Sequence, residues 1–355
     1  MRLIFAFMLC VLLSSCSKTE PLYNSQSYVF GTLVDITIYG ETETKAQQIS
    51  NQIFQDFQAL HVRLHAWKPS KLKTLNAAFA QGKTPVIVDA DIANMITDAT
   101  TLSAQSKGAF NPSIGGLIEV WGFHDDEFKP KQIDVNKIKS LVQAKPQMTD
   151  IVIDKGKVFS NNQNVQLDLG GYAKGYALDS ALVYLQKQGV KNALINIGGN
   201  IIALGKHGNK PWRVGIQQPR KPNAIATLNL ENGWAIGTSG DYQRYFELAG
   251  KRYCHIINPA TGYPAEGVQA VTVLIAPNKN AGVLSDVASK PIFIAKPQAR
   301  AATASQMGVE NFMVIESQNK IYLSPSIAKR LTWLDKDAEK HATKYATKYT
   351  TQVNQ

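Results

Sequence analysis

The sequence predicts an α+β fold, built from mixed helices and largely antiparallel sheets. Segments with helical spacing of apolar residues and segments with strand-like alternation follow one another without the regular strand–helix–strand period of a parallel sheet. Many of the strand-like segments are separated by short turns that contain glycine, which is typical of antiparallel hairpins. The chain has 355 residues, of which 44% are hydrophobic, so it can bury a large core and is not globally disordered.

The helical segments are identified by apolar residues that recur every three or four positions. Residues 43–64 show the pattern most clearly, with apolar side chains from Ile49 to Leu64 on one helix face. The other predicted helices cover residues 90–106, 135–143, 173–187, 281–295 and 298–307.

The strand-like segments begin with residues 27–39, where apolar and polar residues partly alternate. Hairpins are predicted at 152–160 and 312–323, each around a short polar turn. The other predicted strands cover residues 193–204, 212–217, 224–230, 235–238, 244–247, 251–257 and 268–275.

Residues 1–15 are expected to be a lipoprotein signal peptide. Arg2 precedes an apolar run from Leu3 to Leu13, which is a charged n-region followed by an h-region. This run is much shorter than the roughly 20 residues that a membrane-spanning helix needs. The small residues before Cys16 fit the bacterial lipobox, in which the cysteine is acylated and becomes the new N-terminus. An uncleaved anchor and a plain secretory signal are the alternatives.

This N-terminus predicts a protein that is lipid-anchored through Cys16 on the periplasmic side of a bacterial membrane. Ser17, which follows the lipid cysteine, gives the outer membrane a slight preference over the inner one. We expect residues 16–26 to be a flexible tether and residues 27–335 to be one folded domain. Residues 336–355 are polar and basic, and predict a disordered tail.

The chain carries a net charge of +11, from 38 Lys and Arg against 27 Asp and Glu. Such an excess attracts anions but does not choose among nucleic acid, phosphate esters and lipid headgroups. Three cysteines exclude a disulfide scaffold. Cys10 leaves with the signal peptide and Cys16 carries lipid, so Cys254 is the one thiol of the folded domain. We interpret Cys254 as a core residue, because strand alternation places it on the opposite face from His255.

Residues 167–179 form the densest motif, LDLGGYAKGYALD. A strand ends in a tight turn at Gly170 and Gly171, and a helix then begins. Glycine N–H groups can approach a phosphate closely, and a helix N-terminus favours negative charge. Lys174 adds a cation. An ordinary strand-to-helix turn remains the alternative, because the motif matches neither a P-loop nor a dinucleotide-binding fingerprint.

Two further turns of small residues are predicted. The first contains Gly198 and Gly199, and the second is the GTSGD segment with Thr238, Ser239 and Gly240. Hydroxyls and backbone amides in such turns suit phosphate or ribose oxygens, and they equally suit any β-turn.

Three single side chains could carry chemistry. His255 could act as a general base, because the pKa of histidine lies near the working pH. Asp286 lies in a helix of small residues and could bind Mg²⁺. Trp67 could stack on a flavin or another base. The simpler interpretations are a structural histidine, a solvated aspartate and a core tryptophan.

Taken together, the order of these motifs resembles the ApbE family. The resemblance spans about residues 27–323 and is carried by HAWKPSKLKTLN, FNPSIGGLIEVWGF, LDLGGYAKGYALD, INIGGN, PWRVGIQQP, TSGDYQRYFELAGKRYCHIINPATGYP and SDVASK. It implies an ApbE-like, T-fold-like catalytic unit. Members of this family are FAD:protein FMN transferases, and many are periplasmic lipoproteins, in agreement with the lipobox.

The resemblance also implies a reaction and a site. FMN would pass from FAD to a threonine of a target flavoprotein, with Mg²⁺ bound and AMP released. His255 would be the base, and the Asp286 carboxylate and the Ala173 carbonyl would hold the metal. The residues implied to contact FAD are Trp67, Asp168, Gly170, Gly171, Lys174, Gly198, Gly199, Thr238, Ser239 and Gly240.

This sequence departs from the family pattern at three positions. Asn111 and Asn258 stand where the family usually has Asp, and Lys290 stands where it usually has a Thr that binds the metal. A protonated lysine cannot ligate Mg²⁺, but it can neutralise a phosphate as a point charge. Lys290 is therefore a second catalytic candidate beside His255, and the metal site is altered, weakened or replaced.

Three functions remain open at this point. The first is transfer of FMN to a periplasmic or membrane-bound redox flavoprotein that has a threonine attachment site. The second is hydrolysis of FAD to FMN and AMP, and the third is binding of FAD without catalysis. In each case the positive charge serves the pyrophosphate of FAD, so no nucleic-acid partner is expected.

Overall fold

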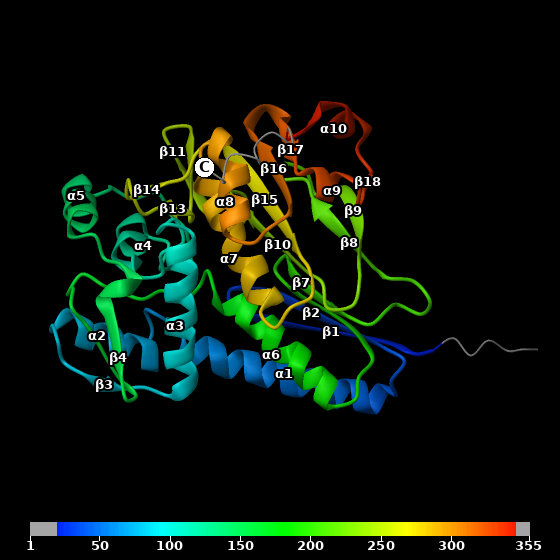
Figure 1. Cartoon of the computed structure of the whole chain (residues 1–355), viewed down its shortest axis with the longest axis horizontal. Helices are drawn as coiled ribbons and strands as arrows, with labels where there is room; N and C mark the ends of the chain where they lie inside the picture. Colours follow the sequence, from blue (N-terminus) through cyan, green and yellow to red (C-terminus); the bar gives the residue numbers. More distant parts are fainter. Residues whose placement is uncertain (1–19, 126, 346–355) are drawn as a thin grey trace, which may run out of the picture.

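The computed structural model describes residues 20–125 and 127–345. A nine-stranded sheet runs through the centre of the molecule (Figure 1), in the order β1-β2-β6-β7-β10-β15-β16-β17-β19. Its neighbouring strands pair antiparallel, except for β17 and β19. The predicted α+β class with largely antiparallel sheets is confirmed. The strands are β1 (Leu22–Val29), β2 (Thr32–Tyr39), β6 (Asn192–Ile197), β7 (Asn200–Leu204), β10 (Ala235–Gly240), β15 (Val268–Ile275), β16 (Asn311–Glu316), β17 (Ile321–Leu323) and β19 (Ala342–Lys344).

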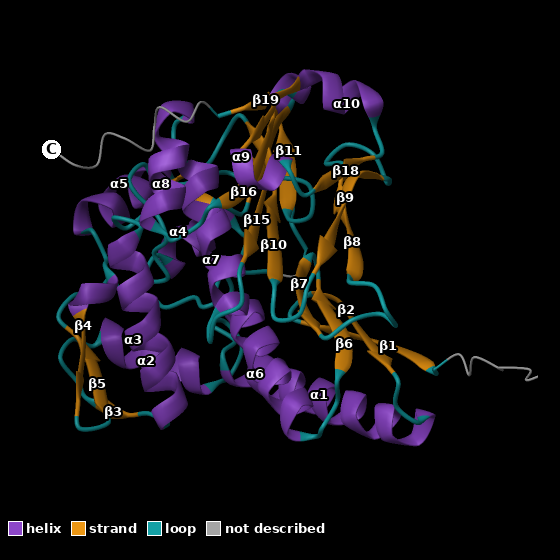
Figure 2. Cartoon of the chain, turned by 45° about the vertical axis from the view of Figure 1, so that its right-hand side comes forward, coloured by secondary structure: helices purple, strands orange, loops and turns teal. Residues whose placement is uncertain are grey.

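Helices cover one face of this sheet, as Figure 2 shows. The covering helices are α1 (Glu43–Arg63), α6 (Ala173–Lys187) and α7 (Ala281–Ile294). Alternate strand residues such as Ile36 and Val271 are fully buried against them in the largest core cluster. Two shorter helices, α8 (Arg300–Gln306) and α9 (Pro325–Ala328), follow α7 along the chain.

A small sheet covers the opposite face of the nine-stranded sheet. It has the strand order β18-β9-β8 and packs against a second core cluster that includes Ile236 and Met313. Its strands are β8 (Trp212–Gln217), β9 (Ala224–Leu230) and β18 (Leu331–Trp333). Because both faces are covered, β15 is buried along its whole length, and it positions β10 beside α7.

A third region packs beside the helical layer and completes the fold (Figure 1). At its centre the indole N–H of Trp121 donates to the carbonyl oxygen of Gly262 at 2.7 Å, in a third core cluster. Its helices are α2 (Lys71–Ala80), α3 (Ala90–Gln105), α4 (Gly115–Trp121) and α5 (Val135–Ala144). Its strands are β3 (Val86–Ile87), β4 (Ile151–Asp154), β5 (Lys157–Ser160), β11 (Tyr245–Leu248), β12 (Lys251–Cys254), β13 (Ile257–Asn258) and β14 (Tyr263–Pro264).

The helices predicted from apolar spacing all occur, with ends that differ by at most two residues. Helices α2 and α4 were not predicted. The first is started by Ser70, whose hydroxyl accepts from the Lys73 amide at 2.9 Å. The second begins with two glycines, which disfavour a helix, but a Cβ on Gly115 would lie 2.6 Å from the carbonyl oxygen of Gln166. Tertiary contact therefore requires glycine there.

The expected tether and tail are corrected where the structure describes them. Strand β1 begins at Leu22, so the end of the predicted 16–26 tether is an edge strand paired with β2. Residues 336–345 are ordered, because α10 (Lys336–His341) follows the capping residue Asp335 and β19 pairs with β17. Polar edge elements such as these have little apolar periodicity of their own. The predicted signal peptide, Cys16, and residues 346–355 lie outside the described residues.

The thiol of Cys254 is buried in the largest core cluster and 2% of the residue is exposed. Burial raises the pKa of this thiol to about 12, so it is not a nucleophile at neutral pH. The prediction that Cys254 is a core residue is confirmed. Among the helices of residues 20–345 that the structure describes, none is long and apolar enough to cross a membrane.

Helices α6 and α7 cross at a contact between two glycines. A Cβ on Gly175 would lie 2.5 Å from the carbonyl oxygen of Gly282, and a Cβ on Gly282 would lie 2.6 Å from that of Gly175. Asp179 locks the crossing, because its carboxylate accepts from the amides of Gly282 and Val283 at 2.7 and 2.8 Å. Burial raises the pKa of Asp179 to about 6.

We expect Gly175→Ala to lower the free energy of unfolding by about 1–3 kcal/mol, as overpacking of a tight contact does. The added methyl group forces α6 and α7 apart, since backbone atoms on the partner helix cannot rotate away. Urea denaturation checks this. The control is Ser180→Ala on the exposed side of α6, which should change stability by no more than about 0.5 kcal/mol. Equal stability of both variants would contradict the tight crossing.

Candidate functional site

The crossing of α6 and α7 places a buried carboxylate between two lysines. Asp286 on α7 is 2% exposed. Its Oδ1 accepts from Lys290 Nζ at 2.7 Å, and its Oδ2 accepts from the Gly175 amide at 3.2 Å. Lys290 Nζ also donates to the backbone carbonyl of Asp286 at 2.6 Å. Lys174, at the start of α6, is half-buried beside this pair.

The charges of this cluster act on one another. Burial opposes ionisation of Asp286, but Lys290, Lys174 and the hydrogen bonds outweigh it, so the pKa of Asp286 is lowered. Burial lowers the pKa of Lys174. The attraction of Asp286 opposes this shift, and the nearby charges of Lys290 and Arg244 add to it. The site therefore has a fixed negative centre surrounded by positive charge.

His255 lies beside these cations, after the end of β12. Its Nδ1 lies 3.2 Å from the backbone carbonyl oxygen of Arg244. Because a carbonyl can only accept, Nδ1 carries the proton and Nε2 has the free lone pair. Burial, and then the charges of Arg244, Lys174 and Lys290, hold the pKa of His255 well below its usual value. The imidazole is thus neutral at pH 7 and able to take a proton at Nε2.

The predicted turn at Thr238–Gly240 is wrong, because these residues form the end of strand β10. Thr238 Oγ1 forms a hydrogen bond with Thr272 Oγ1 on the neighbouring strand β15, at 2.9 Å. Ser239 Oγ lies 2.7 Å from Ser289 Oγ, and Ser289 donates to the Asp286 carbonyl at 2.9 Å. These residues are a strand because they pair with β15. This tertiary contact could not be predicted from a segment of small residues. Ser239 is therefore next to the Asp286 cluster, whereas Thr238, its neighbour in the strand, points to the opposite face of the sheet.

The turn at Gly170 and Gly171 forms another wall of the site. Lys290 packs along Gly171, where a Cβ would lie 2.9 Å from Lys290 Cε. The Gly170 amide donates to Asp168 Oδ1 at 2.7 Å. Asp168 Oδ2 accepts from the indole N–H of Trp67 at 3.3 Å. A continuous path of contacts therefore joins Trp67 to Lys290.

Gly198 and Gly199 form the hairpin turn between β6 and β7, with positive φ at both residues. The Gly198 amide donates to the Leu33 carbonyl at 3.2 Å, and the Gly199 amide donates to Asn196 Oδ1 at 2.9 Å. Both amides are therefore used inside the protein. Of the two interpretations of this turn, the structure favours the simple bend.

Asn111 and Asn258 both shape turns beside the site. Asn111 Oδ1 accepts from the Ser113 amide at 3.1 Å, and Asn258 Oδ1 accepts from the Ala260 amide at 3.0 Å. An aspartate oxygen could accept both of these bonds, but it could not replace the Asn111 amide group that donates to the Pro146 carbonyl at 2.9 Å. Each of these two departures from the family pattern removes one negative charge, and Asn111 adds a hydrogen-bond donor.

Three site residues were not predicted. Ser289 and Arg244 lie on predicted elements, but the sequence did not mark them as site residues. Ser289 is identified by the packing of α7 against β10, and Arg244 by the contact of its carbonyl with His255. Asn200 is 2% exposed and lies close to Gly237 and α7, and its Nδ2 has no hydrogen-bond partner among the described residues. Its place directly after the INIGGN glycines was the signal that could have found it.

The donor set at Asp286 does not fit Mg²⁺. This ion requires about six oxygen ligands near 2.0–2.1 Å in octahedral geometry. Asp286 Oδ1 and the Asp286 carbonyl instead bind the Lys290 ammonium, and Oδ2 binds the Gly175 amide. Ala173 lies at the start of α6, and its carbonyl would be the remaining protein ligand of the predicted pair. No cluster of three His, Cys, Asp or Glu that could hold a metal occurs within residues 20–125 and 127–345.

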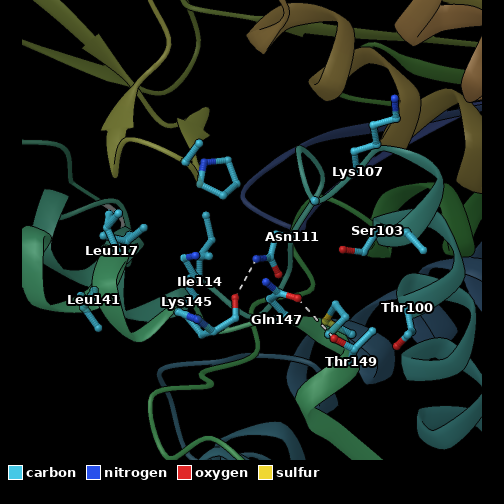
Figure 3. A pocket seen from close by; sticks show the side chains of 17 residues that line it. Thr100, Ser103, Lys107, Asn111, Ile114, Leu117, Leu141, Lys145, Gln147 and Thr149 are labelled. Atoms are coloured by element: carbon cyan, nitrogen blue, oxygen red, sulfur yellow. Dashed lines mark hydrogen bonds between the residues drawn. The ribbon is translucent and has the colours of Figure 1, made fainter.

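A cavity of about 470 Å³ is lined by none of the residues that were predicted to form the site. Figure 3 shows Asn111 in its wall, with the side-chain amide donating to the Pro146 carbonyl. Lys107 and Lys145 also line it, and Pro259 and Ala260 connect it to the strand that follows His255. The cavity and the charged cluster thus have no lining residue in common.

Comparison with known proteins gives consistent matches. The model of the ApbE family matches residues 30–313. An FAD:protein FMN transferase from Rhodobacter capsulatus is 39% identical over 312 residues, which cover 88% of this chain but only 58% of that protein. Another from Klebsiella pneumoniae is 28% identical, and the match covers 89% of this chain and 93% of that protein.

Solved structures agree with the sequence matches. The crystal structure of an ApbE protein from Thermotoga maritima has a TM-score of 0.78 and 28% identity, and the match covers 87% of this chain and 99% of that one. The apo form of the flavinyl transferase ApbE from Pseudomonas stutzeri has the same fold, with a TM-score of 0.74 and 22% identity over 88% of this chain and 97% of that one. On the family match, the relatives and the fold together, this chain belongs to the ApbE family.

Proposed function

We propose that this protein transfers FMN from FAD to a hydroxyl group of an acceptor flavoprotein and releases AMP. The relatives named FAD:protein FMN transferase support the reaction class. The observation that carries the proposal is the neutral His255, which lies beside Lys174 and Lys290 with Nε2 free to accept a proton. A base and two cations at one place are what phosphoryl transfer to a hydroxyl requires.

The proposed reaction forms one bond and breaks one. The acceptor oxygen attacks the phosphorus on the riboflavin side of the FAD pyrophosphate, and the hydroxyl proton passes to His255 Nε2. The bond from that phosphorus to the AMP oxygen breaks, and AMP leaves with the electron pair. Lys174 and Lys290 stabilise the negative charge that grows on the phosphate oxygens. FMN remains attached to the acceptor through a phosphoester.

The remaining wall residues would hold the substrate. Trp67 offers an aromatic surface for the flavin ring, and its indole is oriented by the bond to Asp168. The hydroxyl of Ser239 and the backbone at Gly170 and Gly171 suit polar parts of the nucleotide. We expect a threonine on the acceptor, as the family resemblance implies.

We also propose that the enzyme works at a membrane surface on the periplasmic side, held there by lipid on Cys16. The lipobox of the sequence supports this location. The acceptor would then be a periplasmic or membrane-bound redox flavoprotein that shares the compartment.

The reaction itself can be tested with purified protein, FAD and a candidate acceptor. We expect a fluorescent flavin band on the acceptor in a denaturing gel, a mass increase that matches FMN, and release of AMP. The band should disappear when the attachment threonine of the acceptor is changed to alanine. Release of AMP without any acceptor would instead identify an FAD pyrophosphatase. FAD binding without AMP release or labelling of several true acceptors would contradict both reactions.

The role of His255 makes a pH prediction. Because its pKa lies well below 6.5, the neutral base is present throughout the range from pH 6.5 to 8. We expect kcat/KM to change little over this range and to fall only at lower pH, where the imidazole becomes protonated. An unperturbed histidine would already lose about half of its activity near pH 6.5, and this profile would contradict the assignment.

Replacing the base tests the same residue independently of pH. We expect His255→Asn to lower the transfer rate by about 10²–10⁴-fold, the typical contribution of a general base. FAD affinity should remain within a few-fold, since a neutral imidazole adds little to the binding of an anion. Single-turnover gel fluorescence measures the rate and flavin fluorescence titration measures the affinity. An unchanged rate would exclude His255 as the base.

A further inference from the structure

The ammonium of Lys290 occupies the place at which the family resemblance leads us to expect a divalent cation. It lies 2.7 Å from the carboxylate of Asp286 and 2.6 Å from its backbone carbonyl. We propose that Lys290 is the cation that binds the pyrophosphate of FAD in this protein and that the reaction therefore needs no Mg²⁺. This inference rests on the proposed function for its substrate, but its site can be tested without the reaction.

The first support is that each oxygen of Asp286 already accepts a hydrogen bond. Lys290 and the Gly175 amide engage both carboxylate oxygens, and Lys290 and Ser289 engage the backbone carbonyl. A metal ion would have to displace the Lys290 ammonium from its ion pair with Asp286, and Asp286 is buried. The Lys290 side chain itself is 17% exposed, so its charge remains within reach of a ligand.

The second support is the local charge. Lys174 and Lys290 are two cations that act on one carboxylate, Asp286, which leaves an excess of one positive charge. Adding Mg²⁺ would place two more positive charges beside these two lysines, whereas a pyrophosphate brings the negative charge that they attract.

The third support is how Lys290 is positioned. Its stem lies along Gly171, where a side chain would collide with Lys290 Cε. An ammonium has three donors, and two of them are directed to Asp286. Within the described residues no other hydrogen bond of Nζ is found, so one donor is available to a phosphate oxygen. The glycine turn and the acid thus hold the cation in place, which lowers the cost of ordering a long side chain when FAD binds.

The wild-type protein provides the first test. After removal of metals with EDTA, we expect FAD to bind with a dissociation constant within about twofold of that in millimolar Mg²⁺, measured by flavin fluorescence. Mn²⁺, used as a spectroscopic probe for Mg²⁺, should show no stoichiometric binding by electron paramagnetic resonance, with or without FAD. A requirement for Mg²⁺ in FAD binding, or a stoichiometric Mn²⁺ signal, would overturn the proposal.

Variants at position 290 provide the second test. Lys290→Thr frees the Asp286 carboxylate and adds a hydroxyl oxygen, so we expect FAD binding to weaken at least tenfold in EDTA and to be restored by Mg²⁺, with a new Mn²⁺ signal. Lys290→Met keeps the length of the side chain without the charge and should weaken binding without restoration by Mg²⁺. The control is Lys279→Thr, an exposed lysine before α7, which should behave like the wild type. FAD binding by Lys290→Met equal to that of the wild type in EDTA would overturn the proposal.

These measurements separate this proposal from the proposed function. If no acceptor is labelled under any condition, the transferase assignment fails, while the binding and Mn²⁺ data still decide the role of Lys290. If labelling occurs but is abolished by EDTA and restored by Mg²⁺, the transferase assignment stands and Lys290 is not the substitute for the metal. Circular dichroism of each variant shows whether it has folded, and the wild-type measurements are decisive in either case.

Discussion

The whole site depends on the close approach of α6 and α7. Gly175 and Gly282 allow the two backbones to touch, and Asp179 fastens them with two hydrogen bonds. This contact brings the first turn of α6, with Lys174, next to Asp286 in the second turn of α7. A side chain at either glycine would separate the lysine from the acid. The packing of two glycines, which have no reactive side chain, therefore creates the charged cluster.

Electrostatic preorganisation is the second consequence of this packing. Asp286 is ionised although it is buried, because two lysines and a backbone amide compensate for the loss of water. Burial, and then the charges of Arg244 and of the same two lysines, lower the pKa of His255 and keep it neutral. One arrangement of charge thus provides both an anion-binding centre and a base that can accept a proton. Neither property belongs to a single residue, and removal of one lysine would alter the pKa of both His255 and Asp286.

The sequence predicted the elements with regular apolar spacing almost to their ends, as α1 and α6 show. It failed where neighbours decide the structure. Strand β1 and residues 336–345 are polar and gain order by pairing with the edges of the sheet. Thr238–Gly240 looks like a turn by composition, yet it pairs with β15. The glycines of α4 oppose a helix locally, and packing against Gln166 overrides that preference.

The sequence alone determined the α+β class, the family and the identity of the candidates His255, Asp286, Lys174 and Lys290, because motif order and residue type are linear properties of the chain. Only the tertiary structure decided how these residues act on one another. It showed that the ammonium of Lys290 binds the acid that could otherwise have held a metal. It also showed that the amides of Gly198 and Gly199 are used within the protein. Charge interactions and hydrogen bonds depend on distance, and residues far apart in sequence acquire a distance only when the chain folds.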